Sequence, residues 1–362
     1  MRHVPPVHMN AFADLAQQLL DARFDVDFPE NGSFTSTTSR GRKYWYYDGY
    51  DAATKRKSRK YVGPDDDPEI ARRVSGFDEV KRGARARHPS VRSLLSAGFP
   101  RPDALTGKVV AGLARSGWFR LRGVLVGTVA FQTYPGLVGA FPPTDLRTGD
   151  VDLAMDHGIS VSVGDSVDPV IDTLRTIDPT FSPVPHLTER ARAGAFVNAD
   201  GFRVEFLSPN RGSDDNQAGL TALPSAGGAS AFPMRYLDYL IEGPDRSVLL
   251  HGAGIPILVP RPERFAVHKI MVSGMRRDAA KADKDARQAA FLVEALKTER
   301  GHDLTDALTD AAERGERWRT AILRGLPRQG PDVTTFVRDV IGGPGGAAEY
   351  GHPPNVTTAT TK

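Results

Sequence analysis

The chain has 362 residues, of which 40% are hydrophobic and 25% charged, with a formal net charge of +3, a composition typical of a globular protein and not of a disordered one. It has no cysteine, which excludes disulfide frameworks, thiolate zinc sites and cysteine nucleophiles. The absence of cysteine, of a signal-peptide core and of any run near the roughly 18 apolar residues of a membrane helix predicts a cytoplasmic protein without a membrane partner.

The first part of the chain combines helical and strand patterns. Residues 11–23 space Phe12, Leu15 and Leu19 at helical intervals and predict an amphipathic helix. The stretch 32–69 is rich in Ser, Thr, Tyr and Trp and predicts a β-hairpin or meander. Residues 66–98 look helical, with a break expected at Pro89.

The predicted hairpin is basic as well as aromatic. Such a surface can follow phosphates with its cations and stack bases on its rings, so residues 40–61 predict an RNA-binding element. The alternative is a small module or dimerisation element whose tyrosines pack in a core. The residues concerned are Arg40, Arg42, Lys43, Lys55, Arg56, Lys57, Arg59 and Lys60, interleaved with Tyr44, Trp45, Tyr46, Tyr47 and Tyr61.

The middle of the chain alternates predicted helices and short strands. A helix is expected over 102–117, and the apolar stretch that follows reads as a strand ending at Gly127. A short helix and a glycine- and proline-bearing loop come next. Further elements are a strand at "GDVDLAM", a helix near 166–177, two strands around an Asp200–Gly201 turn, and a strand at 257–260.

Two aspartates stand out in the strand over residues 149–155. Side chains two apart in a strand share one face, so Asp150 and Asp152 project together, while Val151 and Leu153 take the other face. Two carboxylates this close repel unless they are solvated, protonated or bridged by a cation. Mg²⁺ is a natural bridge because it takes one or two carboxylates together with substrate phosphates. The alternative is a solvated strand end.

Two further segments add to this pattern. Glu205 alternates with Val204 and Phe206, so it would join the two aspartates in a metal site if its strand pairs with theirs; otherwise it is a surface charge. Gly127 and Thr128, at a strand end and helix start, offer close backbone approach, N–H donors and a hydroxyl to a phosphate. An ordinary strand-to-helix turn is the alternative.

The chain after Pro262 reads as mostly helical to about residue 325. It carries the cations Lys269, Arg276, Lys281 and Lys284. Lys281 and Asp285 stand at the i,i+4 spacing of an exposed helix face, which is the alternative to a role in binding. The Gly- and Pro-rich end, residues 341–362, predicts a disordered tail.

The order of these motifs resembles the DNA polymerase β-type nucleotidyltransferase superfamily, and within it a bacterial family with that fold. The stretches that carry the resemblance are "GTVAFQTYPGLVGA", "TGDVDLAM", "FRVEFLSP" and "VPRPERFAVHKIMVSGMRRDAAKADKDARQAA". The resemblance implies Asp150, Asp152 and Glu205 as catalytic metal ligands, and Gly127 and Thr128 as triphosphate contacts. A helix of the later segment would lend Lys269, Arg276, Lys281 or Lys284 to the triphosphate, with Lys269 the preferred residue.

We therefore predict an α+β protein with a polymerase β-like core of mixed sheet and flanking helices over 99–260. A basic, β-rich N-terminal module would occupy 1–98, a helical region 261–340 and the tail 341–362. The expected activity is transfer of an NMP from an NTP such as ATP to an acceptor hydroxyl, with Mg²⁺ or Mn²⁺ as cofactor. An inert nucleic-acid-binding protein and the toxin of a toxin–antitoxin pair remain alternatives. The acceptor (RNA, protein or small molecule), the NTP and the oligomeric state stay open.

Overall fold

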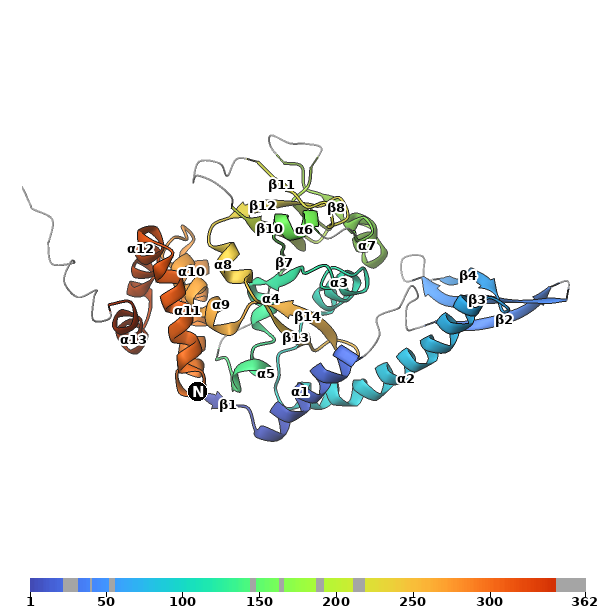
Figure 1. The fold of residues 1–362 in the computed structure, drawn as a ribbon, viewed down its shortest axis with the longest axis horizontal. Helices are drawn as coiled ribbons and strands as arrows, with labels where there is room; N and C mark the ends of the chain where they lie inside the picture. Colours follow the sequence, from blue (N-terminus) through green and yellow to red (C-terminus); the bar gives the residue numbers. More distant parts are fainter. Residues whose placement is uncertain are drawn as a thin grey trace, which may run out of the picture. The chain divides into compact units, whose positions relative to one another are not determined.

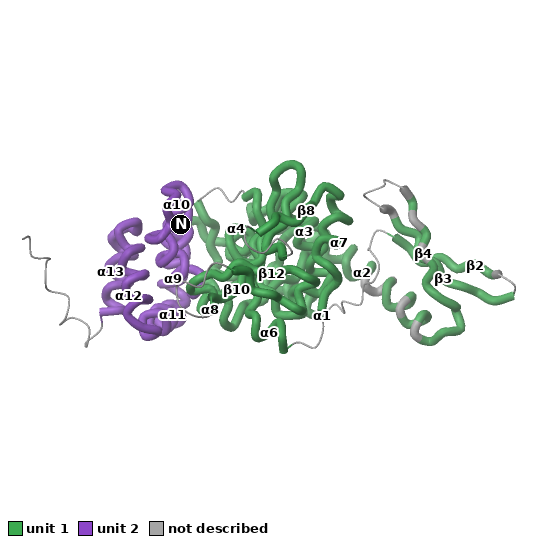
Figure 2. Tube along the Cα trace, turned by 90° about the horizontal axis from the view of Figure 1, so that it is seen from above, with its two compact units in different colours: residues 1–262 green, residues 263–362 purple. Residues whose placement is uncertain are grey.

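The structure is a computed structural model that describes residues 1–21, 32–39, 41–51, 56–143, 148–162, 166–186, 192–210 and 219–342. The chain divides into two compact units, residues 1–262 and residues 263–362 (Figure 2). Within the described ranges, no helix combines the length and the apolar character needed to cross a membrane. Most of the predicted tail, residues 343–362, lies outside these ranges.

The N-terminal segment contains two helices and a separate small sheet (Figure 1). Strands β2, β3 and β4 form an antiparallel meander, one of the two forms that the sequence predicts. The elements are β1 (Arg2–His3), α1 (Pro6–Asp21), β2 (Ser33–Ser39), β3 (Arg42–Asp51), β4 (Arg56–Pro64) and α2 (Pro68–Ser96).

Helix α2 is continuous through Pro89, so the predicted break there is wrong. Its two ends pack into different hydrophobic clusters. Phe77 joins Tyr47 from the small sheet, whereas Val91 and Leu94 join residues of α1 such as Leu15. Tertiary packing at both ends holds the helical path although proline removes one backbone hydrogen bond.

The larger sheet of the first unit is mixed, with β7 between β5 and β10. Strand β10 runs parallel to β7 and β12 and antiparallel to β9. Helices accompany this sheet, so the predicted α+β class is confirmed. The elements are α3 (Ala104–Arg115), β5 (Val124–Val126), α4 (Gly127–Phe131), α5 (Pro135–Val138), β6 (Ala140–Phe141), β7 (Asp150–Ala154), α6 (His157–Ser162), α7 (Val170–Ile177), β8 (Ser182–Pro183), β9 (Ala195–Val197), β10 (Arg203–Pro209), β11 (Thr221–Ala222), β12 (Ser230–Met234), α8 (Leu237–Ile241), β13 (Asp245–Leu249) and β14 (Ile255–Val259).

The second unit is helical in its described part. The helical pattern predicted to about residue 325 continues in a further helix, which begins at a proline, as helices often do, and ends near the predicted limit of the helical region at residue 340. Val333 and Val337 of that helix are buried. The elements are α9 (Pro262–Ser273), α10 (Ala279–Glu299), α11 (Gly301–Glu313), α12 (Glu316–Gly325), a 3-10 turn (Leu326–Arg328) and α13 (Pro331–Ile341).

Candidate active site

The pairing of β7 with β10 brings the three predicted carboxylates onto neighbouring strands. The two strands run parallel, with Glu205 opposite Asp152 and Arg203 opposite Asp150. All four side chains are half-buried, and they share one face because paired positions in a sheet point the same way. The strand pairing that the sequence predicts for Glu205 is therefore present.

The opposite face of the same strands explains why this register forms. Val151, Leu153, Val204 and Phe206 are fully buried there, with relative exposures of 0%. The ring of Phe206 packs edge-on against Trp118, with 5.0 Å between centroids. A shift of one residue would exchange buried and polar side chains, so the apolar face fixes the carboxylates on the other side.

Gly127 lies directly against the second aspartate. It follows β5, which pairs antiparallel with β7 and sets Val126 opposite Asp152. Its φ is +68°, a left-handed conformation that only glycine adopts without strain. A Cβ at this position would meet the Oδ2 atom of Asp152. Thr128 continues into the short helix α4, so the predicted strand-to-helix turn is present.

Polar neighbours hold two of the carboxylates. The hydroxyl of Thr148 donates a hydrogen bond to Oδ1 of Asp150, and Arg203 forms an ion pair with Glu205. Within the described residues, no three acidic or histidine side chains lie close enough together to hold a metal ion. Asp150 and Asp152 are the pair that could share a hard divalent cation, because two carboxylates together with substrate phosphates satisfy Mg²⁺.

Arg203 is a member of this site that the sequence analysis did not single out. It stands two residues before Glu205, so strand alternation places both side chains on the carboxylate face. The same period-two pattern that identifies Glu205 could have found it.

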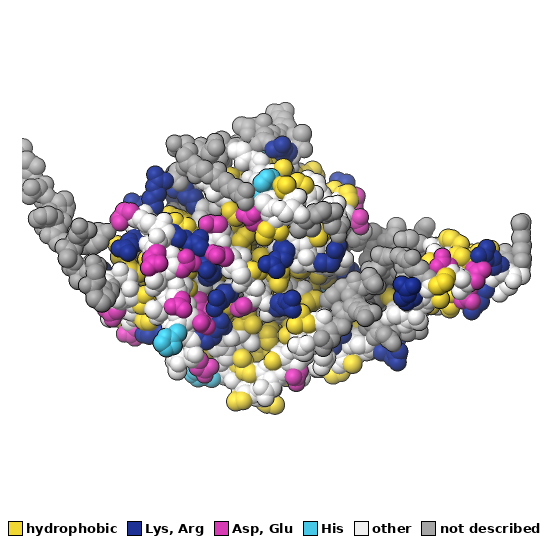
Figure 3. All heavy atoms as spheres, viewed as in Figure 1, with side chains coloured by type: hydrophobic (Ala, Val, Ile, Leu, Met, Phe, Trp, Pro, Cys, Tyr) yellow, Lys and Arg dark blue, Asp and Glu magenta, His cyan; other side chains and the backbone are white. Residues whose placement is uncertain are grey.

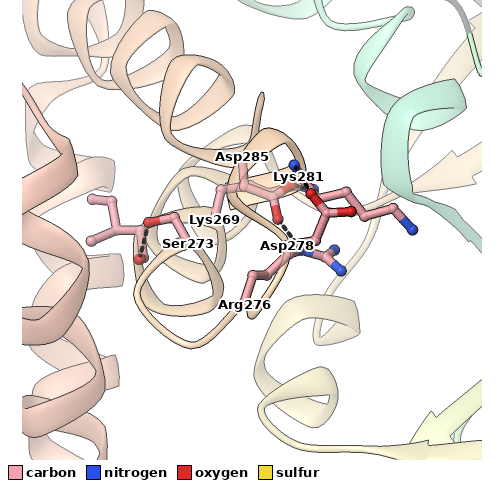
Figure 4. Close-up of polar contacts among 7 residues, drawn as sticks. Lys269, Ser273, Arg276, Asp278, Lys281 and Asp285 are labelled. Carbon is pink, nitrogen blue, oxygen red and sulfur yellow. Dashed lines mark hydrogen bonds and ion pairs between the residues drawn. The ribbon is translucent and has the colours of Figure 1, made fainter. Parts of the chain in front are cut away.

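Two of the four predicted cations of the second unit, Lys269 and Arg276, converge on a buried carboxylate. Lys269 of α9 forms an ion pair with Oδ1 of Asp285 on α10, and both side chains are at most 9% exposed. The Nε atom of Arg276 lies 2.5 Å from the other oxygen, Oδ2. Figure 4 shows the two cations converging on Asp285. Burial opposes ionisation of Asp285, but the charges of Lys269 and Arg276 hold its pKa below the ordinary value.

The alternative, an exposed ion-pair face around Lys281 and Asp285, does not hold at Asp285. That side chain points into the unit, because it neutralises Lys269 there. Lys281 is exposed, and its backbone N–H caps α10 by donating to Asp278 (Figure 4). Lys284 is half-buried on the same helix. The burial of Asp285 depends on contacts between α9 and α10 that no local spacing reveals.

His268 lies beside Lys269 in the interior of the second unit. It is 7% exposed, and burial together with the neighbouring charge of Lys269 lowers its pKa to about 3. The imidazole is therefore neutral at physiological pH.

A comparison with protein-family models identifies one family. The model of a protein family described as nucleotidyltransferase matches residues 104–313, a span that includes Gly127, the three carboxylates and the four cations. No curated protein matches the sequence. A solved structure, titled an antigenic nucleotidyltransferase-like protein from Paracoccidioides brasiliensis, is 18% identical, with 62% of this chain and 95% of that chain covered. Its TM-score is 0.31.

Proposed function

Because the chain belongs to the nucleotidyltransferase family whose model spans residues 104–313, we propose that it transfers an NMP from an NTP to an acceptor hydroxyl. Its core would be of the DNA polymerase β type. The observation that carries this proposal is the carboxylate face of β7 and β10, which lies inside the matched span and sets Glu205 opposite Asp152.

Asp150 and Asp152 would hold Mg²⁺ or Mn²⁺, with Glu205 as a third ligand once it exchanges its partner Arg203 for the cation. Carboxylate oxygens on one strand face are the donors that such ions prefer. A bound divalent cation would supply charge stabilisation for the phosphoryl group in the transition state. The positive charge of Arg203 offsets part of the repulsion among the three carboxylates when the cation is absent.

The protein's own groups would orient and activate the acceptor. Glu205 accepts the proton of the acceptor hydroxyl, whose oxygen attacks the α-phosphorus of the NTP. The bond from that phosphorus to the bridging oxygen breaks, and pyrophosphate leaves with the electron pair. Before the cation binds, the ion pair with Arg203 keeps the carboxylate of Glu205 on the sheet face from which it would act.

The triphosphate would be held by the turn at Gly127. Backbone N–H groups after Gly127 and the hydroxyl of Thr128 would donate to phosphate oxygens next to Asp152. We also propose Lys269, Arg276, Lys281 and Lys284 as triphosphate contacts. Lys281 is the most accessible lysine of this group, whereas Lys269 is already neutralised by Asp285.

Labelled NTPs test the proposal directly. Wild-type protein incubated with each NTP, Mg²⁺ and total RNA should release pyrophosphate and label an acceptor. Asp150→Asn and Asp152→Asn should each lower the rate about 100-fold or more, because a lost ligand removes several kcal/mol of charge stabilisation. Asp200→Asn, in the exposed turn before β10, removes the same charge from outside the site and should keep the wild-type rate. Wild-type rates in both β7 variants would refute the assignment.

A second candidate function is binding of nucleic acid without transfer. The basic, aromatic sheet β2–β4 favours it, since such surfaces bind single strands without any catalytic group. Binding of RNA by wild-type protein that releases no pyrophosphate from any NTP would support this alternative over the enzyme.

A further inference from the structure

The sheet β2–β4 has two chemically different faces. One face packs on α2, where Tyr47 is 4% exposed and contacts Phe77, with Phe34 and Val62 at the edge of the cluster. Because strand residues alternate between faces, Tyr44 and Tyr46 of β3 point away from that cluster. Tyr61 of β4 pairs with Tyr46 and takes the same outer face. The tyrosines are therefore divided between the two faces of the sheet: Tyr47 lies on the packed face, and Tyr44, Tyr46 and Tyr61 lie on the outer face.

The outer tyrosines form an aromatic cluster in which Tyr61 is exposed and Tyr44 and Tyr46 are half-buried. Tyr61 is 55% exposed. Its ring centroid lies 5.6 Å from that of Tyr46 and 6.2 Å from that of Tyr44. The planes of Tyr46 and Tyr61 meet at 70°, so the rings are not stacked on each other. Hydrophobic, basic and acidic side chains lie side by side over this sheet in Figure 3.

Cations are held in position beside these rings. The guanidinium of Arg59 lies 4.5 Å from the ring centroid of Tyr46, and its NH2 donates to the hydroxyl of Thr37 at 2.9 Å. Arg59 also pairs with Asp48 at 3.3 Å. Both side chains of this ion pair are more than a third exposed, so solvent screens it and a phosphate can compete for the arginine.

Two more cations share the outer face. Arg42 lies 6.0 Å from the ring centroid of Tyr44 and pairs with Asp66 at 2.9 Å. Lys57 is exposed and stands two residues before Arg59 on β4, which places it on the same face. Lys43 lies on the opposite face of β3, where its ammonium is 5.0 Å from the ring centroid of Trp45. Arg40 and Lys55 lie outside the described residues, as do the side chains of Arg56 and Lys60.

We propose that this outer face, formed by Arg42, Tyr44, Tyr46, Lys57, Arg59 and Tyr61, binds single-stranded RNA as the acceptor of the transferred nucleotide. The proposal rests on the proposed function and names its acceptor class. Exposed rings stack on bases, and bases are free for stacking in a single strand but enclosed in a duplex. The hydroxyls of Thr35 and Thr37 and the carboxylate of Asp48 line the same face, and they offer partners to the 2′-hydroxyl that only RNA carries.

Fluorescence anisotropy tests whether this face binds RNA. A fluorescent 12-nucleotide single-stranded RNA is titrated with the full chain over a salt series, without NTP. Tyr61→Ala should weaken binding at least about 5-fold with an unchanged salt slope, because one stacking contact is lost. Tyr61→Phe keeps the ring and should retain wild-type affinity. The readout involves no transfer, so it can fail while the transferase proposal stands.

A matched pair of charge variants shows which face of the sheet contacts the phosphates. Lys57→Ala should lower the slope of log affinity against log salt by about 0.7, the value for one phosphate contact on a single strand. Lys43→Ala removes the same charge from the other face and should leave the slope unchanged. Equal slopes for both variants, an unchanged affinity of Tyr61→Ala, or equal binding of a DNA strand or an RNA duplex would overturn the proposal.

Discussion

At the scale of single residues, Gly127 links backbone conformation to the candidate chemistry. Its positive φ turns the chain from β5 into α4, and the missing side chain leaves room for the carboxylate of Asp152. Any other residue would meet both the strained backbone and that carboxylate. The geometry of the site thus depends on the absence of a Cβ at this position. A search for chemically active side chains would not find such a residue.

Gly127→Ala should therefore abolish transfer, although the loss of stability alone would not account for that effect. Alanine at positive φ costs about 1–2 kcal/mol, and its Cβ would also displace Asp152. Gly139 has nearly the same φ, +67°, but a Cβ there meets nothing nearer than 3.9 Å. Urea unfolding and pyrophosphate release should show similar destabilisation in Gly127→Ala and Gly139→Ala, with loss of transfer only in the first. If both variants released pyrophosphate at the same rate, the close approach of Gly127 to Asp152 would not matter for transfer.

At the scale of elements, helices α9 and α10 are joined through Asp285. Breaking a buried ion pair leaves an uncompensated charge in the interior, which costs about 3–5 kcal/mol. We expect Asp285→Asn to lower the free energy of unfolding by this amount. Asp283→Asn on the same helix removes a carboxylate that is 56% exposed and pairs with Arg328, so it should cost about 0–1 kcal/mol. Urea unfolding followed by circular dichroism measures both changes in unfolding free energy. Similar losses in the two variants would mean that the buried ion pairs of Asp285 do not stabilise the unit.

The sequence predicts elements well where the pattern is local and less well where packing decides. Alternation alone identifies the two faces of β7 and β10, because one apolar face must be buried. It does not predict that α2 runs through Pro89, since that depends on clusters at both ends of the helix. It also misreads Asp285, whose spacing from Lys281 is typical of a solvated face while its true partners come from α9 and the following turn.

At the scale of the whole molecule, the second unit should respond to acid. His268 is buried with a pKa of about 3, while in the unfolded chain its pKa is about 6.5. Between these values the unfolded chain binds a proton that the folded chain does not, so stability is present above pH 6.5 and falls as the pH decreases toward 3. Asp285, whose folded pKa is also lowered, adds to the loss only at more acidic pH.

His268→Gln should flatten this pH dependence. Wild-type protein should lose about 2 kcal/mol of unfolding free energy between pH 7 and pH 5 that the variant does not lose, because glutamine has no proton to bind. Urea unfolding at the two pH values gives the comparison, with His302→Gln as the control at an exposed histidine of the same unit. Identical pH dependence in wild type and His268→Gln would contradict the assignment.

Helix α2 has one further consequence. Its two ends are anchored in clusters that share no residue, one with Phe77 and Tyr47, the other with Val91 and Leu94. Energetic effects of substitutions at separate, non-contacting sites add without coupling. The small sheet can therefore change in sequence without altering the stability of the core around α1. In evolutionary terms, α2 allows the small sheet and the core around α1 to vary independently.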